Sequence, residues 1–198
     1  MNRPIGFSDH ERILLIASSG IGNVLQFTPA LRSLRRAHPD ASIDCLCFSN
    51  STASIMRNNP NIRETIVHRE SSYIYPERST RKRGRQEDHQ DRAIIKKLSF
   101  RRYTSSINIF PIGGLRPAIL VRRIGARKRI ATPLRNPRYR WMTRFFYTHV
   151  VDSPPEQHGI DIGFAQVGID PTGEDRQMEI SIPESHLESA RATLTRLC

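Results

Sequence analysis

The residues best suited to chemistry form a small glycine-rich loop from Ser18 to Asn23, with the sequence SSGIGN. The apolar run before it, Arg12–Ala17, predicts a buried parallel strand because it is short and is followed by glycines. A helix that begins after such a loop presents free N–H groups, and the glycines let a ligand approach the backbone closely. The loop therefore predicts a binding site for an anion or for sugar hydroxyls.

The loop does not fit the common nucleotide-binding motifs. Gly20 and Gly22 supply two glycines of a dinucleotide-binding fingerprint, but Leu25 stands where the third is required. No acidic residue ends the second predicted strand, where a ribose-binding carboxylate is expected. No Gly-Lys-Ser/Thr follows the loop, which excludes a P-loop. We therefore do not expect NAD or a nucleoside triphosphate to bind here.

The elements expected around this loop alternate between strands and helices. Pro29 lies inside the predicted helix 24–37, so either the helix kinks there or Thr28 caps a new helix. The polar, arginine-rich segment Arg69–Asp91 predicts a mobile loop. The alternation predicts an α/β fold, a Rossmann-like doubly wound parallel sheet. The strands are expected at 12–17, 42–48, 62–67, 104–110 and 128–131, and the helices at 24–37, 51–57, 92–100, 115–124, 157–167 and 184–197.

Charge points to an anionic partner. The 198 residues carry 31 Lys and Arg against 19 Asp and Glu, a net charge of +12. No acidic residue occurs between Asp91 and Asp152, an interval that holds fifteen Lys or Arg. Such a stretch attracts nucleic acid, anionic lipid headgroups or a phosphorylated glycan, although a generally basic proteome would also explain it. Aromatic residues alternate with arginines over 136–146, which indicates a membrane-surface patch, a nucleic-acid surface or a helix that buries its aromatics.

The sequence also indicates where the protein resides and whether it binds a metal. No apolar run approaches the roughly 20 residues of a membrane-spanning helix, and the first residues carry no signal-peptide pattern. Cys45 and Cys47 are expected to be buried free thiols, which agrees with a cytoplasmic protein. The histidines form no pair at helical spacing, so no metal site is expected.

The segment Ile13–Leu34, ILLIASSGIGNVLQFTPALRSL, resembles the opening of the ADP-heptose:lipopolysaccharide heptosyltransferases, glycosyltransferase family 9. That family begins with a strand, then Ser-Ser/Gly-x-Gly-Asp-Val/Ile, then Thr-Pro-Ala-Leu-Arg. The likeness continues in order through five further motifs, which are His38–Ala41, Asn59–Ile62, Arg101–Tyr103, Gly125–Arg127 and His158.

The resemblance implies the N-terminal, acceptor-side domain of a GT-B glycosyltransferase. It implies no cofactor and no metal, since helix dipoles and basic groups stabilise the leaving diphosphate. It implies an ADP-heptose-like nucleotide-sugar donor held by a C-terminal domain. The implied acceptor is an anionic glycolipid of the lipopolysaccharide core. The implied location is cytoplasmic, at the inner face of the cytoplasmic membrane as a peripheral protein, with nucleic acid not expected as a partner.

The resemblance assigns the position of the family's general base to Asn23. The substrate-binding candidates are Ser19, Gly20, Gly22, Gln26, Arg116 and Arg122. Arg116 and Arg122 lie on or near one predicted helix, where solvent exposure and contact with an acceptor phosphate both explain them. The family has aspartate where this chain has Asn23, and a carboxamide cannot accept a proton near neutral pH. The chain is therefore inactive, or uses another base, or relies on positioning alone, and in each case Asn23 could also cap the helix.

The expected organisation is a polar leader at 1–11, an acceptor-binding domain at 12–170, and a linker with a helix at 171–198 that leads to a donor-binding domain outside this chain. Whether the chain is an enzyme is left open by the sequence. We expect it to be truncated relative to the family, and weak or inactive alone. The alternative is a non-enzymatic basic module that binds anionic lipid or nucleic acid.

Overall fold

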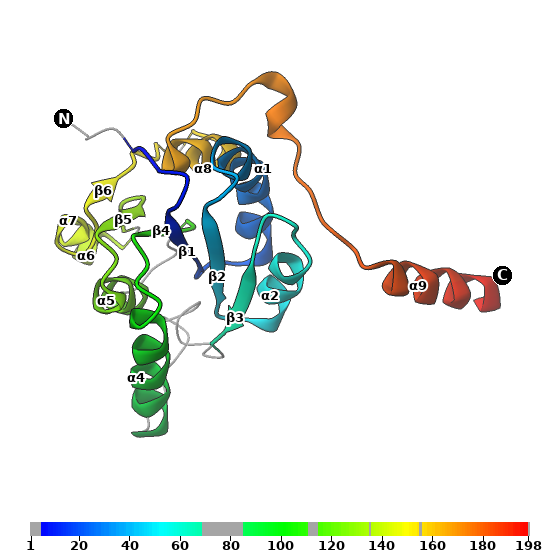
Figure 1. The fold of residues 1–198 in the computed structure, drawn as a ribbon, viewed down its shortest axis with the longest axis horizontal. Helices are drawn as coiled ribbons and strands as arrows, with labels where there is room; N and C mark the ends of the chain where they lie inside the picture. Colours follow the sequence, from blue (N-terminus) through cyan, green and yellow to red (C-terminus); the bar gives the residue numbers. More distant parts are fainter. Residues whose placement is uncertain (1–4, 69–84, 111–114, 135, 155, 198) are drawn as a thin grey trace.

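The computed structural model describes residues 5–68, 85–110, 115–134, 136–154 and 156–197. Within them, all strand pairs are parallel and form one sheet in the order β3-β2-β1-β4-β5-β6. The predicted Rossmann-like α/β fold is confirmed (Figure 1). The strands are β1 (Arg12–Ala17), β2 (Ser42–Cys47), β3 (Glu64–Val67), β4 (Ser105–Asn108), β5 (Lys128–Ala131) and β6 (His149–Val150), the last of which the sequence did not indicate.

Helices cover both faces of the sheet. Because side chains alternate along a strand, Ile13 and Leu15 of β1 join one core cluster and Leu14 and Ile16 join the other. Helices α1 (Ile21–Ala37), α2 (Asn50–Arg57) and α8 (Gly159–Val167) pack on the first face. Helices α4 (Arg85–Ser99), α5 (Leu115–Ile124) and α7 (Thr143–Phe146) pack on the second, and the short helix α6 (Pro137–Arg140) precedes α7.

Helix α1 runs without interruption through Pro29 and begins three residues earlier than expected. Proline has no N–H, so it leaves the carbonyl four residues before it without its helical partner. That carbonyl belongs to Leu25, and the Thr28 hydroxyl donates to it at 2.8 Å. Thr28 therefore does not cap a second helix. Its hydroxyl hydrogen-bonds the Leu25 carbonyl, which Pro29 leaves without a helical partner.

The segment expected to be a mobile loop, Arg69–Asp91, is in part helical. Helix α4 begins at Arg85, whereas the sequence indicated a helix only from Arg92. Residues 69–84 lie outside the described residues. Asp91 is buried in α4 and contacts His68, with His68 Nε2 and Asp91 Oδ1 2.8 Å apart. This contact fixes the end of β3 against α4, which explains why a sequence of low apolar content is ordered here.

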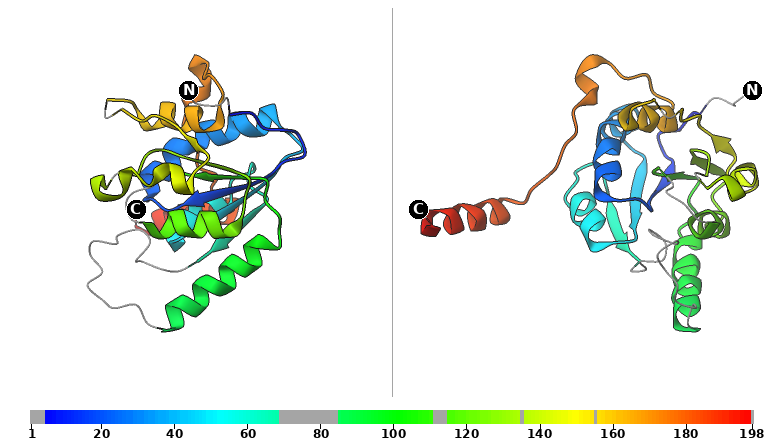
Figure 2. Two further views of the ribbon diagram at one scale, coloured as in Figure 1. Left: turned by 90° about the vertical axis from the view of Figure 1, so that its left-hand side faces the viewer. Right: turned by 180° about the vertical axis from the view of Figure 1, so that it is seen from behind.

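The C-terminal segment is bound to α1 for part of its length. The Arg32 guanidinium pairs with Glu179 at 2.8 Å, and Arg36 pairs with Asp175. Hydrogen bonds from Thr172 and Arg36 lower the pKa of Asp175 to about 2. Beyond Glu179 the chain extends away from the sheet to helix α9 (Glu184–Leu197), which lies clear of the two helical layers (Figures 1 and 2). Among the helices of the described residues, none combines the length and the apolar character needed to cross a bilayer.

A buried carboxylate lies at the end of the sheet opposite the glycine loop. Asp44 of β2 is 0% exposed and accepts two hydrogen bonds from Arg63, at 2.9 and 2.6 Å. The Tyr103 hydroxyl donates to it at 2.6 Å and Arg101 at 3.1 Å. Burial alone would raise the pKa of Asp44, but the hydrogen bonds from Arg63 and Tyr103 lower it below its ordinary value. The network therefore joins β2 to the segments that precede β3 and β4.

We expect Asp44→Asn to lower the free energy of unfolding at neutral pH by about 3 kcal/mol, because Arg63, Arg101 and the buried Tyr103 hydroxyl lose an ionised acceptor. The pKa of Asp44 is lower in the folded chain than in the unfolded chain, where it is about 3.9. The ionised form therefore stabilises the fold above the unfolded pKa, and this contribution is lost as the pH falls through the lower folded value. Urea unfolding between neutral pH and about pH 3 measures both effects.

The matched control is Glu64→Gln. Glu64 pairs with the same Arg101 but its side chain is 42% exposed, so its loss is expected to cost less than about 1 kcal/mol. The Asp44→Asn variant is also expected to lose less stability than the wild type over the acidic range. Equal costs for the two substitutions, or identical pH profiles, would contradict a dominant role for the buried carboxylate.

Candidate functional site

The glycine loop leaves the carboxyl end of β1 and leads directly into α1. Gly20 is the residue before the first helical turn, with φ −70° and ψ 171°, and no side chain caps the helix. The first turn also contains no acidic residue. A Cβ at Gly20 or Gly22 would meet no atom of the described residues within 4 Å. The first N–H groups of α1 thus have no capping side chain among these residues, and they carry the positive end of the helix dipole.

Buried hydrogen bonds attach the loop to neighbouring segments of the sheet. The Ser18 hydroxyl donates to Asn108 Oδ1 at 2.8 Å, and Ser19 donates to the Ile109 carbonyl at 3.3 Å. The Asn108 amide in turn donates to the Tyr147 hydroxyl at 2.8 Å. Ser18, Ser19 and Asn108 are all at most 1% exposed. The loop is thus bonded to the end of β4 and, through Asn108, to the segment that precedes β6.

This network is uncharged. Burial raises the pKa of Tyr147 above its ordinary value, so its hydroxyl stays protonated at neutral pH. The Gln166 amide donates to the Asn108 carbonyl at 2.9 Å, and Gln166 Oε1 is buried without a partner among the described residues. Neutral hydrogen-bonding groups of this kind fix positions and do not exchange protons near neutral pH. Their role is to orient the loop.

A second helix N-terminus lies beside α1. Helix α8 begins at Gly159, and His158 caps it by accepting from the Ile160 N–H through Nδ1, at 3.2 Å. The Gln26 carboxamide occupies the space that a Cβ at residue 159 would need. Gln26 therefore lies against the first turn of α8, and a larger residue at 159 would displace its carboxamide. His158 acts as a structural cap in this arrangement.

Asn23 is the third residue of α1 and is partly exposed at the open side of the loop. Its carboxamide makes no hydrogen bond with any described residue. Capping of α1 therefore does not account for Asn23, since Gly20 holds the cap position. The side chain is available to hydrogen-bond a ligand hydroxyl, although it cannot take up its proton near neutral pH.

The structure brings four of the predicted substrate-binding residues together and separates two. Ser19, Gly20, Gly22 and Gln26 lie at or next to the loop. Arg116 is half-buried in the first turn of α5, next to residues 111–114, which are outside the described residues. Arg122 lies two turns further along α5, where its guanidinium stands 4.4 Å from the Phe145 ring centroid and donates to the Phe145 carbonyl at 3.0 Å. It is therefore directed at α7 and not at the loop.

Sequence reasoning missed Asn108, Tyr147 and Gln166. A polar residue inside the apolar run Ile107–Phe110 was the available signal for Asn108. Nothing local marks Tyr147 or Gln166, because their partners are 39 and 58 residues away. Among the described residues, no group of three or more His, Cys, Asp or Glu could hold a metal ion.

Comparison with known proteins shows the fold. No family model and no curated protein matches the sequence. A glycosyltransferase of family 9 from Veillonella parvula matches with a TM-score of 0.72 at 19% identity, over 98% of this chain and 52% of that one. Heptosyltransferase WaaC of E. coli, solved with ADP-2-deoxy-2-fluoro heptose, matches with a TM-score of 0.62 at 18% identity, over 82% of this chain and 50% of that one. ADP-heptose lipopolysaccharide heptosyltransferase II of E. coli matches with a TM-score of 0.61 at 16% identity, over 92% of this chain and 50% of that one.

The chain thus has the Rossmann-like fold found in these family 9 glycosyltransferases. It spans about half the length of the solved structures it matches. The resemblance noted in the sequence extends to the three-dimensional arrangement of the sheet and its flanking helices.

The buried network predicts that Asn108→Ala strongly lowers the free energy of unfolding. The change leaves the Ser18 and Tyr147 hydroxyls without their partner and opens a cavity, so we expect a loss of about 2–4 kcal/mol in the free energy of unfolding. Tyr147→Phe removes only one of the hydrogen bonds and is expected to cost about 1–2 kcal/mol. Urea unfolding with both single variants and the double variant measures their coupling.

Ser106→Ala is the matched control on the same strand. The Ser106 hydroxyl is buried without a partner among the described residues, so its removal is expected to change stability by less than about 0.5 kcal/mol. Additive costs for Asn108 and Tyr147, or a Ser106 variant as unstable as Asn108→Ala, would show that the network does not act as a unit.

Proposed function

We propose that this chain is the acceptor-binding half of a heptosyltransferase-like glycosyltransferase of lipopolysaccharide core or related glycan synthesis. The observation that carries the proposal is the likeness to a family 9 glycosyltransferase over 98% of the chain, with a TM-score of 0.72. The open glycine loop supports it, since ligands of parallel α/β sheets bind at the carboxyl ends of the strands near a reversal of strand order. Here that reversal lies between β1 and β4.

The proposed acceptor is an anionic glycolipid. The N–H groups at the start of α1 suit a phosphate or carboxylate of the acceptor, because they lie at the positive end of the helix dipole and no acidic residue stands in that turn. Gln26 and Asn23 supply carboxamides that can hydrogen-bond sugar hydroxyls. We place the acceptor at the cytoplasmic face of the inner membrane, with this chain as a peripheral protein.

The proposed reaction transfers a sugar from a nucleotide-sugar, of the ADP-heptose type, to an acceptor hydroxyl. The hydroxyl oxygen attacks the anomeric carbon, the nucleoside diphosphate leaves, and the hydroxyl proton must pass to a base. Asn23 orients the hydroxyl but does not take the proton. Because the chain spans about half the length of its matches, we propose that a donor-binding half in addition to these residues completes the site. Residues 12–170 would then form the acceptor domain and residues 171–198 the connection.

Gly22→Glu tests where the acceptor binds. The residue 22 position has open space for a side chain, and a carboxylate in the first turn of a helix is favourable, so the variant is expected to fold with unchanged or higher stability. The same carboxylate repels an anionic acceptor. Isothermal titration with a water-soluble phosphorylated core oligosaccharide is expected to show at least tenfold weaker binding.

Ser185→Glu is the matched control, because it places the same carboxylate at an exposed position in the first turn of α9, which lies clear of the helical layers. It is expected to leave binding of the oligosaccharide unchanged. Equal binding by the wild type and Gly22→Glu would instead favour the alternative, a basic module that binds anions elsewhere on its surface. No binding by the wild type would contradict the acceptor assignment.

Asn23→Asp tests the missing base. With the chain fused to the donor-binding half of a family 9 enzyme, sugar transfer to a core glycolipid is expected to rise at least tenfold, since a general base contributes about 100-fold or more. Asn50→Asp adds a carboxylate to the first turn of another helix and is expected to leave transfer unchanged. Unchanged or lower transfer by the Asn23→Asp variant would rule out a lost base as the cause of weak activity.

A further inference from the structure

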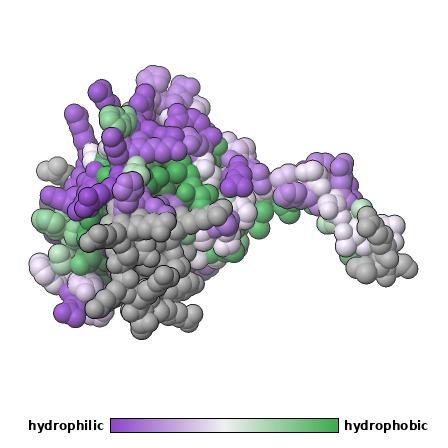
Figure 3. Space-filling model, turned by 90° about the horizontal axis from the view of Figure 1, so that it is seen from below, coloured by the Kyte–Doolittle hydropathy of each residue, from purple (hydrophilic) through white to green (hydrophobic). Residues whose placement is uncertain are grey.

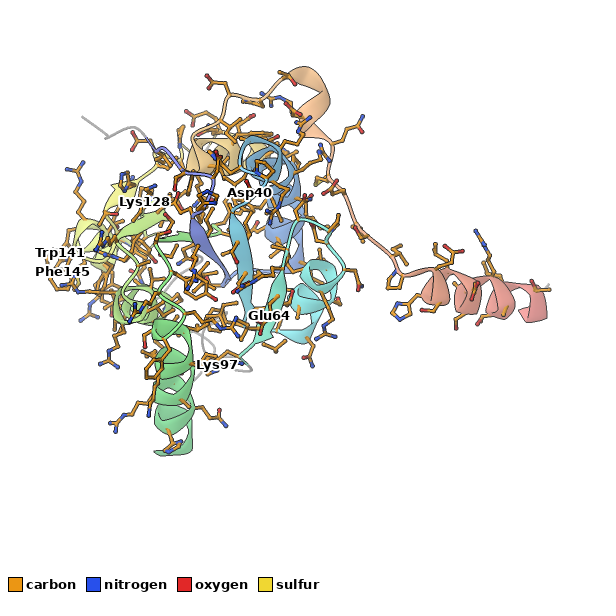
Figure 4. All side chains as sticks on the ribbon, in the orientation of Figure 1. Asp40, Glu64, Lys97, Lys128, Trp141 and Phe145 are labelled. Carbon is orange, nitrogen blue, oxygen red and sulfur yellow. The ribbon has the colours of Figure 1, made fainter. Side chains whose placement is uncertain are left out.

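Two large aromatic side chains are exposed on the short helices that follow β5. Trp141, between α6 and α7, is 78% exposed, and Phe145 of α7 is 59% exposed. They lie together at the outer edge of the molecule, at the end opposite α9 (Figure 4). Exposed arginines surround them. We call this surface the α6–α7 face, formed by Arg122, Arg138, Arg140, Trp141, Arg144 and Phe145.

We propose that the α6–α7 face docks this chain onto an anionic phospholipid bilayer. Trp141 and Phe145 enter the boundary between headgroups and acyl chains, and the arginines contact lipid phosphates. Aromatic residues with basic neighbours are the side chains that surface-bound proteins place at this depth. Of the alternatives that the sequence left open for 136–146, burial of all the aromatics is wrong, since only Phe146 is fully covered and Tyr139 is partly covered.

The indole of Trp141 can leave water without leaving a polar group unpaired. Its Nε1–H donates to the Arg138 carbonyl at 3.1 Å, so the only polar group of the ring already has a partner within the protein. A ring whose N–H is satisfied can enter an apolar region without losing a hydrogen bond to water. Trp141 therefore gains from burial of its apolar surface and loses little by desolvation.

Phe145 is held in place before it meets a membrane. The Arg122 guanidinium stands over one face of its ring at 4.4 Å from the centroid, and Phe146 packs against it at 5.1 Å in a T-shaped arrangement. Phe146 itself is 5% exposed and belongs to the core. The ring is thus fixed relative to the sheet, and its insertion requires no ordering of a flexible side chain.

The stretch of chain that carries the two rings has charges of one sign. The chain contains no carboxylate between Asp91 and Asp152, so no acidic residue of that stretch reduces the attraction of the arginines for lipid phosphates. Each arginine near an anionic surface strengthens binding about fivefold at physiological salt. Figure 3 shows hydrophobic and hydrophilic surface side by side at the end of the molecule opposite α9.

A bilayer fits this face better than single-stranded nucleic acid. Bases bind such surfaces by stacking on open aromatic faces, but the Phe145 ring already carries Arg122 on one face. The Trp141 N–H is also bonded within the protein and cannot read a base or a phosphate. Insertion into the headgroup region uses the remaining apolar ring surface, and this surface is what the structure leaves exposed.

Trp141 is the only tryptophan of the chain, so its fluorescence reports on this face directly. Vesicles of phosphatidylcholine with phosphatidylglycerol are expected to shift its emission to shorter wavelength, and brominated acyl chains are expected to quench it. Vesicles of phosphatidylcholine alone are expected to do neither. Unchanged emission with the anionic vesicles would overturn the proposal, as would a shift caused by a single-stranded oligonucleotide and not by the vesicles.

Two triple variants separate this face from charge in general. Arg138→Gln, Arg140→Gln and Arg144→Gln together are expected to weaken sedimentation with anionic vesicles about 100-fold. Arg57→Gln, Arg92→Gln and Lys96→Gln remove the same charge from exposed positions on α2 and α4 and are expected to change it less than about fivefold. Equal losses in the two triple variants would overturn the proposal.

A third variant tests the aromatics. Trp141→Gln with Phe145→Gln keeps every arginine and is expected to weaken sedimentation at least tenfold, because burial of two large apolar side chains is lost. Unchanged sedimentation would overturn insertion of these rings. None of these measurements uses a sugar donor or acceptor, so their failure would leave the proposed sugar transfer untouched.

Discussion

Strand β1 lies in the middle of the sheet with both of its faces covered, and the rest of the structure depends on this burial. The residues Ile13 to Ala17 are 0% exposed, and β2 and β4 flank the strand on its two sides. Burial on both faces favours apolar side chains along the strand, and its carboxyl end opens at the point where the strand order reverses. The glycine loop lies at that end. Its location thus follows from the packing of five side chains and not from the loop itself.

The features that the sequence could predict are those set by neighbouring residues. The strand, the loop and the helix after it follow from local pattern, and so does the pair of buried thiols, Cys45 and Cys47. The start of α1 was missed because glycine at 20 and 22 resembles a loop. In the structure the buried Val24 donates its N–H to the Gly20 carbonyl at 3.3 Å, and the helix therefore begins at Ile21. Local pattern in a single sequence carries no information on such tertiary effects.

Long-range polar contacts could not be predicted from the sequence, for a different reason. Asp44 looks like a solvent-facing residue of a half-exposed strand, yet it is fully buried because Arg63 and Arg101, 19 and 57 residues later, converge on it. Arg122 was one of the substrate-binding candidates, and its guanidinium stands over the ring of Phe145 on α7. Charged side chains pair with groups that are near in space, and one sequence does not reveal that proximity. The loop itself was predictable, whereas the neutral groups that hold it were not.

The position of β4 beside β1 has a consequence for how the chain folds. Ser18 and its partner Asn108 are 90 residues apart, so β1 obtains its second neighbour only after about 90 further residues have been made. Closing a loop of this length is entropically costly, and contacts between distant residues slow folding. Until β4 has been made, one edge of this apolar strand is unpaired. An unpaired strand edge can pair with another chain, so β1 is open to aggregation during this interval.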